Sequence, residues 1–143
     1  MKGKKLETVF IVEDSQVQRS MLKDHLTKYS NLKIKEYSSG DACVRELIVG
    51  DVQEPDLILM DYFLDSNLSN SRDGLESLAK LKEIYPGINV IMLTSVDNKK
   101  IIELATNKGA LDYVIKGVSG FSDLDTVLQK HFELKNVKIC KRD

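Results

Sequence analysis

The stretch Leu57-Ile58-Leu59-Met60-Asp61 joins four consecutive apolar residues to a single carboxylate. Pro55 and Asp56 precede it as a turn signal, and a short apolar run bounded in this way is typical of a strand buried on both faces. Asp61 would then lie at the carboxyl end of that strand, where ligands bind in open α/β sheets. An acid at this position can serve as a metal ligand, a nucleophile or the cap of the next turn.

The composition predicts one globular domain spanning residues 1–143. Apolar residues make up 42% and charged residues 30% of the chain, as in typical soluble proteins. A net charge of -1 argues against electrostatic binding to nucleic acid or to a membrane surface. No apolar run approaches the length of a membrane span. The two distant cysteines, Cys43 and Cys140, fit a reduced, cytoplasmic protein better than a disulfide scaffold.

Strand and helix patterns alternate five times along the chain. Strands are predicted at residues 8–12, 32–37, 57–61, 88–93 and 111–115, and helices at 16–29, 42–49, 73–85, 98–107 and 119–134. Such alternation predicts right-handed βαβ units and an α/β fold with a parallel sheet covered on both faces. A flavodoxin-like, doubly wound order 2-1-3-4-5 brings the polar strand ends together. The apolar faces of the first and last helices are predicted to include Val17, Met21, Phe121 and Phe132.

Polar residues follow four of the predicted strands. Glu13 and Asp14 follow the first, Asp61 ends the third, Thr94 follows the fourth, and Lys116 follows the fifth. The carboxyl ends of parallel strands share one edge of the sheet, so three carboxylates would meet there and repel each other unless a cation joined them. An all-oxygen site with few protein ligands suits Mg²⁺.

These residue types together can carry phosphoryl transfer to a carboxylate. A carboxylate beside Mg²⁺ can act as the nucleophile, and the oxygens of the transferred group must be neutralised. Mg²⁺ can hold one of these oxygens, the Lys116 ammonium a second, and the Thr94 hydroxyl with nearby backbone N–H groups a third. The sequence therefore predicts an aspartyl-phosphate site.

The chain resembles the response regulator receiver domain of two-component signalling, and it is similar to the chemotaxis-type, single-domain members. The resemblance covers about residues 6–134, with 135–143 as a C-terminal tail. Five motifs carry it in order, each at a strand end or a helix start: Phe10-Ile11-Val12-Glu13-Asp14-Ser15, Leu57-Ile58-Leu59-Met60-Asp61, Asp73-Gly74, Val90-Ile91-Met92-Leu93-Thr94-Ser95 and Gly109-Ala110-Leu111-Asp112-Tyr113-Val114-Ile115-Lys116.

The resemblance implies roles for individual residues of the metal and phosphoryl sites. It implies Asp61 as the phospho-acceptor, Asp14 as a direct Mg²⁺ ligand and Glu13 as a residue acting on the metal through water. It also implies that Phe63 offers its backbone carbonyl to the metal. Lys116 would be the partner of the phosphoryl group.

Thr94 and Tyr113 would form the switch pair of this family. Two departures concern the loops beside the site: Asp73-Gly74 follows the acceptor about five residues later than usual, and Gly117 stands where proline is usual after the lysine. The loop over the site is therefore expected to be longer and more polar than in typical members.

The expected function is a stand-alone signalling module rather than an enzyme. A histidine kinase or phosphotransfer protein would phosphorylate Asp61, and the module would then bind a target protein or pass the group on. One alternative is a pseudo-receiver that folds alike but is never phosphorylated. Another is an aspartate-nucleophile phosphatase. Such enzymes of the haloacid-dehalogenase type have a second Asp two residues after the nucleophile, where this chain has Phe63, and this argues against the alternative.

Overall fold

The computed structural model describes residues 4–50, 52–62, 74–95 and 97–134. A five-stranded parallel sheet forms the centre, with strands in the order β3-β2-β4-β5-β6. These strands are β2 (Thr8–Val12), β3 (Lys33–Tyr37), β4 (Leu57–Asp61), β5 (Val90–Thr94) and β6 (Asp112–Ile115). When the five strands of this sheet are numbered in chain order, their order across the sheet is 2-1-3-4-5, so the predicted flavodoxin-like topology is confirmed.

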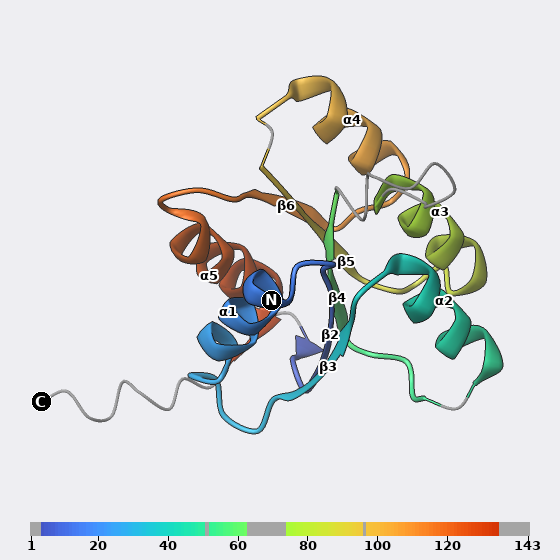
Figure 1. The fold of residues 1–143 in the computed structure, drawn as a ribbon, viewed down its shortest axis with the longest axis horizontal. Coiled ribbons are helices and arrows are strands. Elements are labelled where there is room, and N and C mark those ends of the chain that lie inside the picture. Colours follow the sequence, from blue (N-terminus) through green and yellow to red (C-terminus); the bar gives the residue numbers. More distant parts are fainter. Residues whose placement is uncertain (1–3, 51, 63–73, 96, 135–143) are drawn as a thin grey trace, which may run out of the picture.

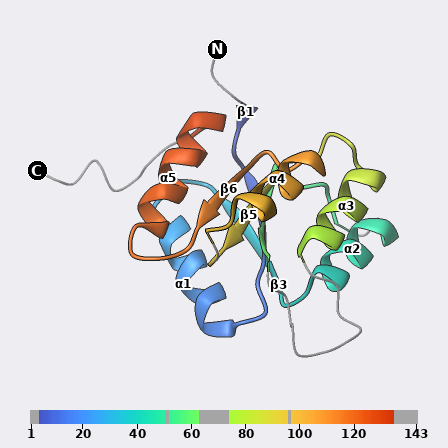
Figure 2. The ribbon, with the colours of Figure 1, turned by 90° about the horizontal axis from the view of Figure 1, so that it is seen from above.

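Five helices connect and follow the strands, as the alternation predicts. They are α1 (Gln16–Leu26), α2 (Gly40–Val49), α3 (Gly74–Ile84), α4 (Lys99–Asn107) and α5 (Gly120–His131). Figures 1 and 2 show α1 and α5 on one side of the sheet and α2 and α3 on the other. No helix in the described ranges is long and apolar enough to cross a bilayer.

Side-chain alternation along the strands divides the core between these two layers. One cluster packs the apolar residues of α1 and α5 against Val9, Ile11, Leu57, Leu59 and Val114. The other packs α2, α3 and Ala105 of α4 against Phe10, Val12, Ile58, Met60 and Met92. We call these the α1–α5 face and the α2–α4 face of the sheet.

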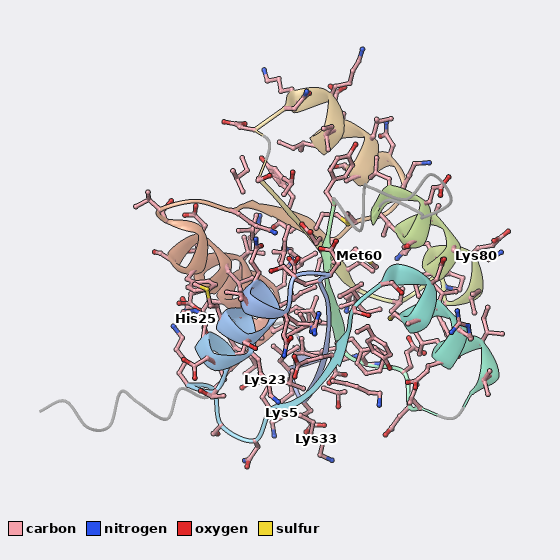
Figure 3. All side chains as sticks on the ribbon, in the orientation of Figure 1. Lys5, Lys23, His25, Lys33, Met60 and Lys80 are labelled. Carbon is pink, nitrogen blue, oxygen red and sulfur yellow. The ribbon has the colours of Figure 1, made fainter. Side chains whose placement is uncertain are left out.

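The central strand is buried along its whole length. The side chains of Leu57, Ile58, Leu59 and Met60 are each 0% exposed, and Met60 lies at the middle of the molecule in Figure 3. An apolar residue is needed at every position because both faces of this strand are covered. The uninterrupted apolar run is therefore explained by the central position of β4 in the sheet.

Local capping explains where several helices begin and end. Ser15 caps α1 by accepting the N–H of Gln18, and Ser39 caps α2 by accepting that of Ala42. Asn98 caps α4 in the same way. Gly50 ends α2 with a left-handed φ of 84°, a conformation that costs glycine little. Asp73, where the sequence predicts the third helix to start, lies outside the described residues.

A polar cluster joins α1 and the turn after it to α5. The Asp125 carboxylate accepts hydrogen bonds from the Tyr29 hydroxyl at 2.5 Å and from the Lys28 ammonium, and its Oδ1 lies 3.0 Å from His25 Nε2. The His25 ring also stacks on Phe121, with centroids 4.5 Å apart, and Figure 3 labels His25 on α1 beside α5. These contacts fix how the two helices lie against each other.

The structure corrects three expectations about the first and last helices. α1 ends at Leu26 instead of continuing to residue 29. Val17, Met21 and Phe121 are 69%, 53% and 39% exposed rather than core, because the buried stripe of each helix is narrower than its apolar stripe. α5 ends at His131, and Phe132 begins the two-residue strand β7 (Phe132–Glu133), which pairs with β1 (Lys4–Lys5). That pairing was not predicted.

Gly74 allows the first turn of α3 to lie directly against the end of β4. Its N–H donates to the Tyr62 carbonyl at 2.8 Å, and a Cβ at this position would lie 2.5 Å from the Asp61 carbonyl oxygen and 2.9 Å from the Tyr62 Cα. Both are backbone atoms of β4 or of the residue that follows it, so they cannot move aside at low cost.

We therefore expect Gly74→Ala to lower the free energy of unfolding by about 1–3 kcal/mol. Gly87→Ala is the matched control, because nothing lies within 4 Å of a Cβ built there and its effect should stay within about 0.5 kcal/mol. Urea denaturation of both variants measures the difference. Equal stability of the two variants would show that α3 does not depend on close approach to β4.

Candidate functional site

The predicted polar residues meet at the carboxyl edge of the sheet. Asp61 is the last residue of β4 and Thr94 the last of β5. Glu13 directly follows β2, and Lys116 directly follows β6. Because all five strands run parallel, these four positions share one end of the sheet.

Strand alternation also places three of these residues on the same face. Ile11, Leu59 and Val114 belong to the core of the α1–α5 face, and residues two positions further along a strand point the same way. Glu13, Asp61 and Lys116 each lie two positions beyond one of them. The first turn of α1 therefore borders the site.

Glu13, Asp14 and Asp61 form a group of three carboxylates. Each offers one oxygen, and these oxygens lie within 4.8 Å of one another. Glu13 is 3% and Asp61 4% exposed, whereas Asp14 is exposed. Oxygen-only donors that converge on one point, with one side open to water, fit a hard divalent cation such as Mg²⁺.

Lys116 neutralises part of this acidic group. Its Nζ lies 3.0 Å from Asp61 Oδ1 and 3.1 Å from Glu13 Oε1. The pairing is short, and both carboxylates are almost fully buried, so solvent screens it little. The ammonium therefore stands where it can contact an oxygen of any group attached to Asp61.

The electrostatics of the site shift the pKa values of both partners. Burial raises the pKa of the Asp61 carboxyl to about 6, with the charges of Glu13 and Asp14 adding to the rise and Lys116 opposing it. Burial acts to lower the pKa of Lys116, but the attraction and hydrogen bonds of Asp61 and Glu13 raise it overall. Lys116 therefore carries its positive charge at neutral pH, while the pKa of the Asp61 carboxyl lies close to neutral pH.

Three hydrogen bonds, two to its backbone and one to its carboxylate, hold Glu13 in place. Its N–H donates to the Tyr37 carbonyl at 3.0 Å, and its carbonyl accepts from Arg19 Nη1 at 2.6 Å. Its carboxylate accepts from the Ser15 N–H at 3.1 Å. Arg19 also lies 3.4 Å from the Glu36 carboxylate, which ties α1 to β3. Residues of two neighbouring elements therefore fix the direction of the acid.

Thr94 and Tyr113 lie on the opposite face of the sheet from the acids. Thr94 is 2% exposed, and its carbonyl accepts the Lys116 N–H at 2.7 Å. Tyr113 is partly buried against the core of the α2–α4 face. Met92 pairs with Tyr113 in register and lies two positions before Thr94, so both predicted switch residues point toward this face.

Gln18 is a site residue that sequence reasoning missed. Its Oε1 accepts a hydrogen bond from Lys116 Nζ at 2.8 Å. The only sequence signal is its position in the first turn of α1, four residues after Asp14, and a glutamine there is usually explained as part of a helix cap. Phe63, whose carbonyl the resemblance assigns to the metal, lies outside the described residues.

A cavity of about 610 Å³ opens over the site between α1 and α5. Asp14, Gln18, Asp61 and Lys116 contribute polar groups to its lining, and α1 and α5 contribute apolar side chains that include Met21 and Phe121. The exposure of these two apolar residues, which the helical pattern did not predict, follows from this opening. The cavity gives a reactant access to the otherwise buried Asp61.

Comparison with known proteins adds an independent line of observation. The family model of the response regulator receiver domain matches residues 9–130. The response regulator protein VraR of Staphylococcus epidermidis is 29% identical over 130 residues, which cover 90% of this chain and 58% of that protein. The chain thus spans little more than half the length of this relative.

Two further matches extend along most of both chains. The chemotaxis protein CheY of Halobacterium salinarum is 28% identical over 119 residues, covering 83% of this chain and 92% of that protein. The crystal structure of a CheX–CheY–BeF₃–Mg²⁺ complex from Borrelia burgdorferi superposes with a TM-score of 0.72 and 20% identity, covering 85% of this chain and 87% of that one. At that identity the structural match concerns the fold.

The raised pKa of Asp61 predicts a pH-dependent cost in stability. As the pH falls, the folded state takes up this proton near pH 6, before the unfolded chain does near its ordinary value of 3.8. The ionised carboxylate therefore lowers stability above about pH 6, and the cost is relieved as the pH falls below it. We expect Asp61→Asn without metal to be more stable than the parent by about 2 kcal/mol near pH 7.5.

This advantage should shrink toward zero near pH 4, where the folded parent is protonated as well. Thermal and urea unfolding in EDTA across this pH range measure it, with Asp24→Asn, an exposed acid on α1, as the control. A constant advantage across the range, or a less stable variant at neutral pH, would contradict the raised pKa.

Proposed function

The chain belongs to the response regulator receiver domain family, and we propose that it accepts a phosphoryl group on Asp61 in a Mg²⁺-dependent reaction. One observation carries the proposal: the Asp61 carboxylate is buried, lines the cavity, is paired with Lys116 and lies within 4.8 Å of two other acids. A solitary capping aspartate would need neither the lysine nor the acids. This arrangement supports a nucleophile with a bound cation.

Mg²⁺ would be held at the carboxylate group by Asp14 and Asp61 directly and by Glu13 through water. Asp14 is the exposed member of the group, so it can bind a hydrated ion from the solvent side. When bound, the ion supplies positive charge for the phosphoryl oxygens and relieves the repulsion among the acids. The backbone carbonyl of Phe63 completes the proposed ligand set.

Asp61, Lys116 and Thr94 would each have a separate role in the transfer of the phosphoryl group. A carboxylate oxygen of Asp61 forms the new bond to phosphorus, while the bond from phosphorus to the donor's histidine nitrogen breaks and its electrons leave with the imidazole. Lys116 exchanges its ion pair with the Asp61 carboxylate for one with a phosphoryl oxygen. That oxygen lies within reach because the ammonium is already 3.0 Å from Asp61 Oδ1. The Thr94 hydroxyl holds another oxygen.

We infer that the phosphorylated domain signals through protein contacts or passes the group on, and that a histidine kinase or phosphotransfer protein supplies it. Thr94 can reach a phosphoryl oxygen only by moving toward it, and Tyr113 points to the same face of the sheet. Ligation of Thr94 would therefore bias the position of Tyr113 and the surface of α4, β6 and α5. A CheY of the same fold, from Borrelia burgdorferi, forms a complex with CheX, BeF₃ and Mg²⁺, and we propose comparable protein contacts for this chain.

Phosphorylation by acetyl phosphate tests this proposal. The parent protein should gain one phosphoryl group that is stable to neither acid nor base, only in the presence of Mg²⁺, and intact-mass measurement detects it. Asp61→Asn should gain none, because it keeps the shape of the residue and removes the nucleophile. The control Asp24→Asn should be labelled like the parent.

An Asp61→Asn variant that still gains the labile phosphate would place the acceptor elsewhere. A folded parent that gains none, with or without Mg²⁺, would favour a receiver that acts only by binding.

A further inference from the structure

The first turn of α1 departs from the capping pattern that its sequence specifies. Ser15, three residues before Gln18, matches the capping box, in which the glutamine side chain reaches back to the N–H of the capping serine. Here the Ser15 hydroxyl accepts the Gln18 N–H at 3.2 Å, but the Ser15 N–H donates to Glu13 Oε2 at 3.1 Å. Glu13 thus takes the place of the glutamine in the cap, and the Gln18 side chain is left available.

Gln18 instead completes the hydrogen bonding of Lys116. The lysine Nζ lies 2.8 Å from Gln18 Oε1, 3.0 Å from Asp61 Oδ1 and 3.1 Å from Glu13 Oε1. An ammonium has three N–H donors, so these three acceptors satisfy it. The amide contact is the shortest of the three and comes from a helix, whereas the lysine itself follows a strand.

The three acceptors respond differently to the reaction. Asp61 loses its negative charge when an oxygen bonds to phosphorus, and Glu13 and Asp61 both belong to the group that can hold a metal ion. Gln18 is neutral and is the only one of the three acceptors outside that group. Its contact with the lysine is therefore the one that the arrival of a cation or a phosphoryl group does not compete for.

From this geometry we propose that Gln18 is a positioning residue that keeps the Lys116 ammonium directed at the phosphoryl group while the two carboxylates turn to the metal and the phosphorus. The proposal rests on the function proposed above and deepens it. Without the amide, the long lysine side chain would be free to point into the cavity between α1 and α5, which it lines together with Gln18. Holding it in place reduces the conformational freedom lost on reaching the transition state.

A glutamine on the surface of a helix commonly has no role in function. The experiment must therefore separate a Gln18 that positions Lys116 from a Gln18 that is only part of the surface. Gln18→Met keeps the length of the side chain and its helix propensity but removes the acceptor. Gln16→Met is the matched control, because Gln16 is an exposed residue of the same turn and does not line the cavity. Thermal unfolding first establishes that both variants fold like the parent.

The measurement is the rate of phosphorylation by acetyl phosphate as a function of Mg²⁺ concentration. We expect Gln18→Met to lower the maximal rate at saturating Mg²⁺ roughly tenfold, as one lost interaction in the transition state would. The Mg²⁺ concentration giving half the maximal rate should change by less than about twofold, since Gln18 is not a metal ligand. Gln16→Met should match the parent in both quantities.

A conservative variant provides the rescue. Gln18→Glu restores an oxygen acceptor of the same reach but adds a negative charge beside the acids, so its maximal rate should lie between those of Gln18→Met and the parent. Two results would overturn the proposal: Gln18→Met rates equal to those of Gln16→Met, or a change confined to the Mg²⁺ dependence. A parent that is not phosphorylated at all would instead refute the proposed function itself.

Discussion

The ion pair between Lys116 and the buried acids is the interaction on which the rest of the site depends. Burying Asp61 and Glu13 side by side costs free energy, because each carboxylate loses water and repels the other. The Lys116 ammonium, about 3 Å from both, offsets part of this cost but not all of it, since the pKa of Asp61 remains raised to about 6. The remaining strain is what a divalent cation can relieve.

The fold meets this constraint by placing each partner on a different element. Parallel strands end at one edge, and their two-residue alternation turns Glu13, Asp61 and Lys116 to the α1–α5 face. Gly74 lets α3 begin against the backbone of Asp61, and Arg19 fixes the carbonyl of Glu13. The reactive groups are therefore held by packed secondary structure, and the cavity between α1 and α5 supplies their access to a phosphoryl donor.

Much of this arrangement could be predicted from the sequence. The apolar run before Asp61 indicates a strand covered on both faces, and the polar residues at successive strand ends indicate a shared edge. The sheet order and the meeting of the acids with Lys116 follow from these patterns. Helix periodicity, however, counted Val17, Met21 and Phe121 as core, because an apolar stripe does not show how much of it the neighbouring elements cover.

Contacts between elements that are remote in sequence could not be predicted from local sequence patterns. The pairing of β1 with β7 joins two-residue segments at opposite ends of the chain, too short to carry a periodic signal. No sequence pattern singles out Gln18, because a glutamine three residues after a serine at a helix start fits an ordinary helix cap. The structure shows instead that Glu13 accepts the Ser15 N–H and that Gln18 contacts Lys116. The predicted metal contact of Phe63 and the long loop after it lie outside the described residues, and they stay predictions.

The pKa of the Asp61 carboxyl, followed by carbon-detected NMR during a pH titration with and without Mg²⁺, tests the central claim most directly. If burial strains the acids, the Asp61 carboxyl should titrate with a midpoint near pH 6 without metal. Its midpoint should be clearly lower when Mg²⁺ is present, because a cation bound at the acids favours the ionised form. A midpoint near the ordinary aspartate value of 3.8 that Mg²⁺ does not move would show that the acids are neither strained by burial nor joined by a metal ion.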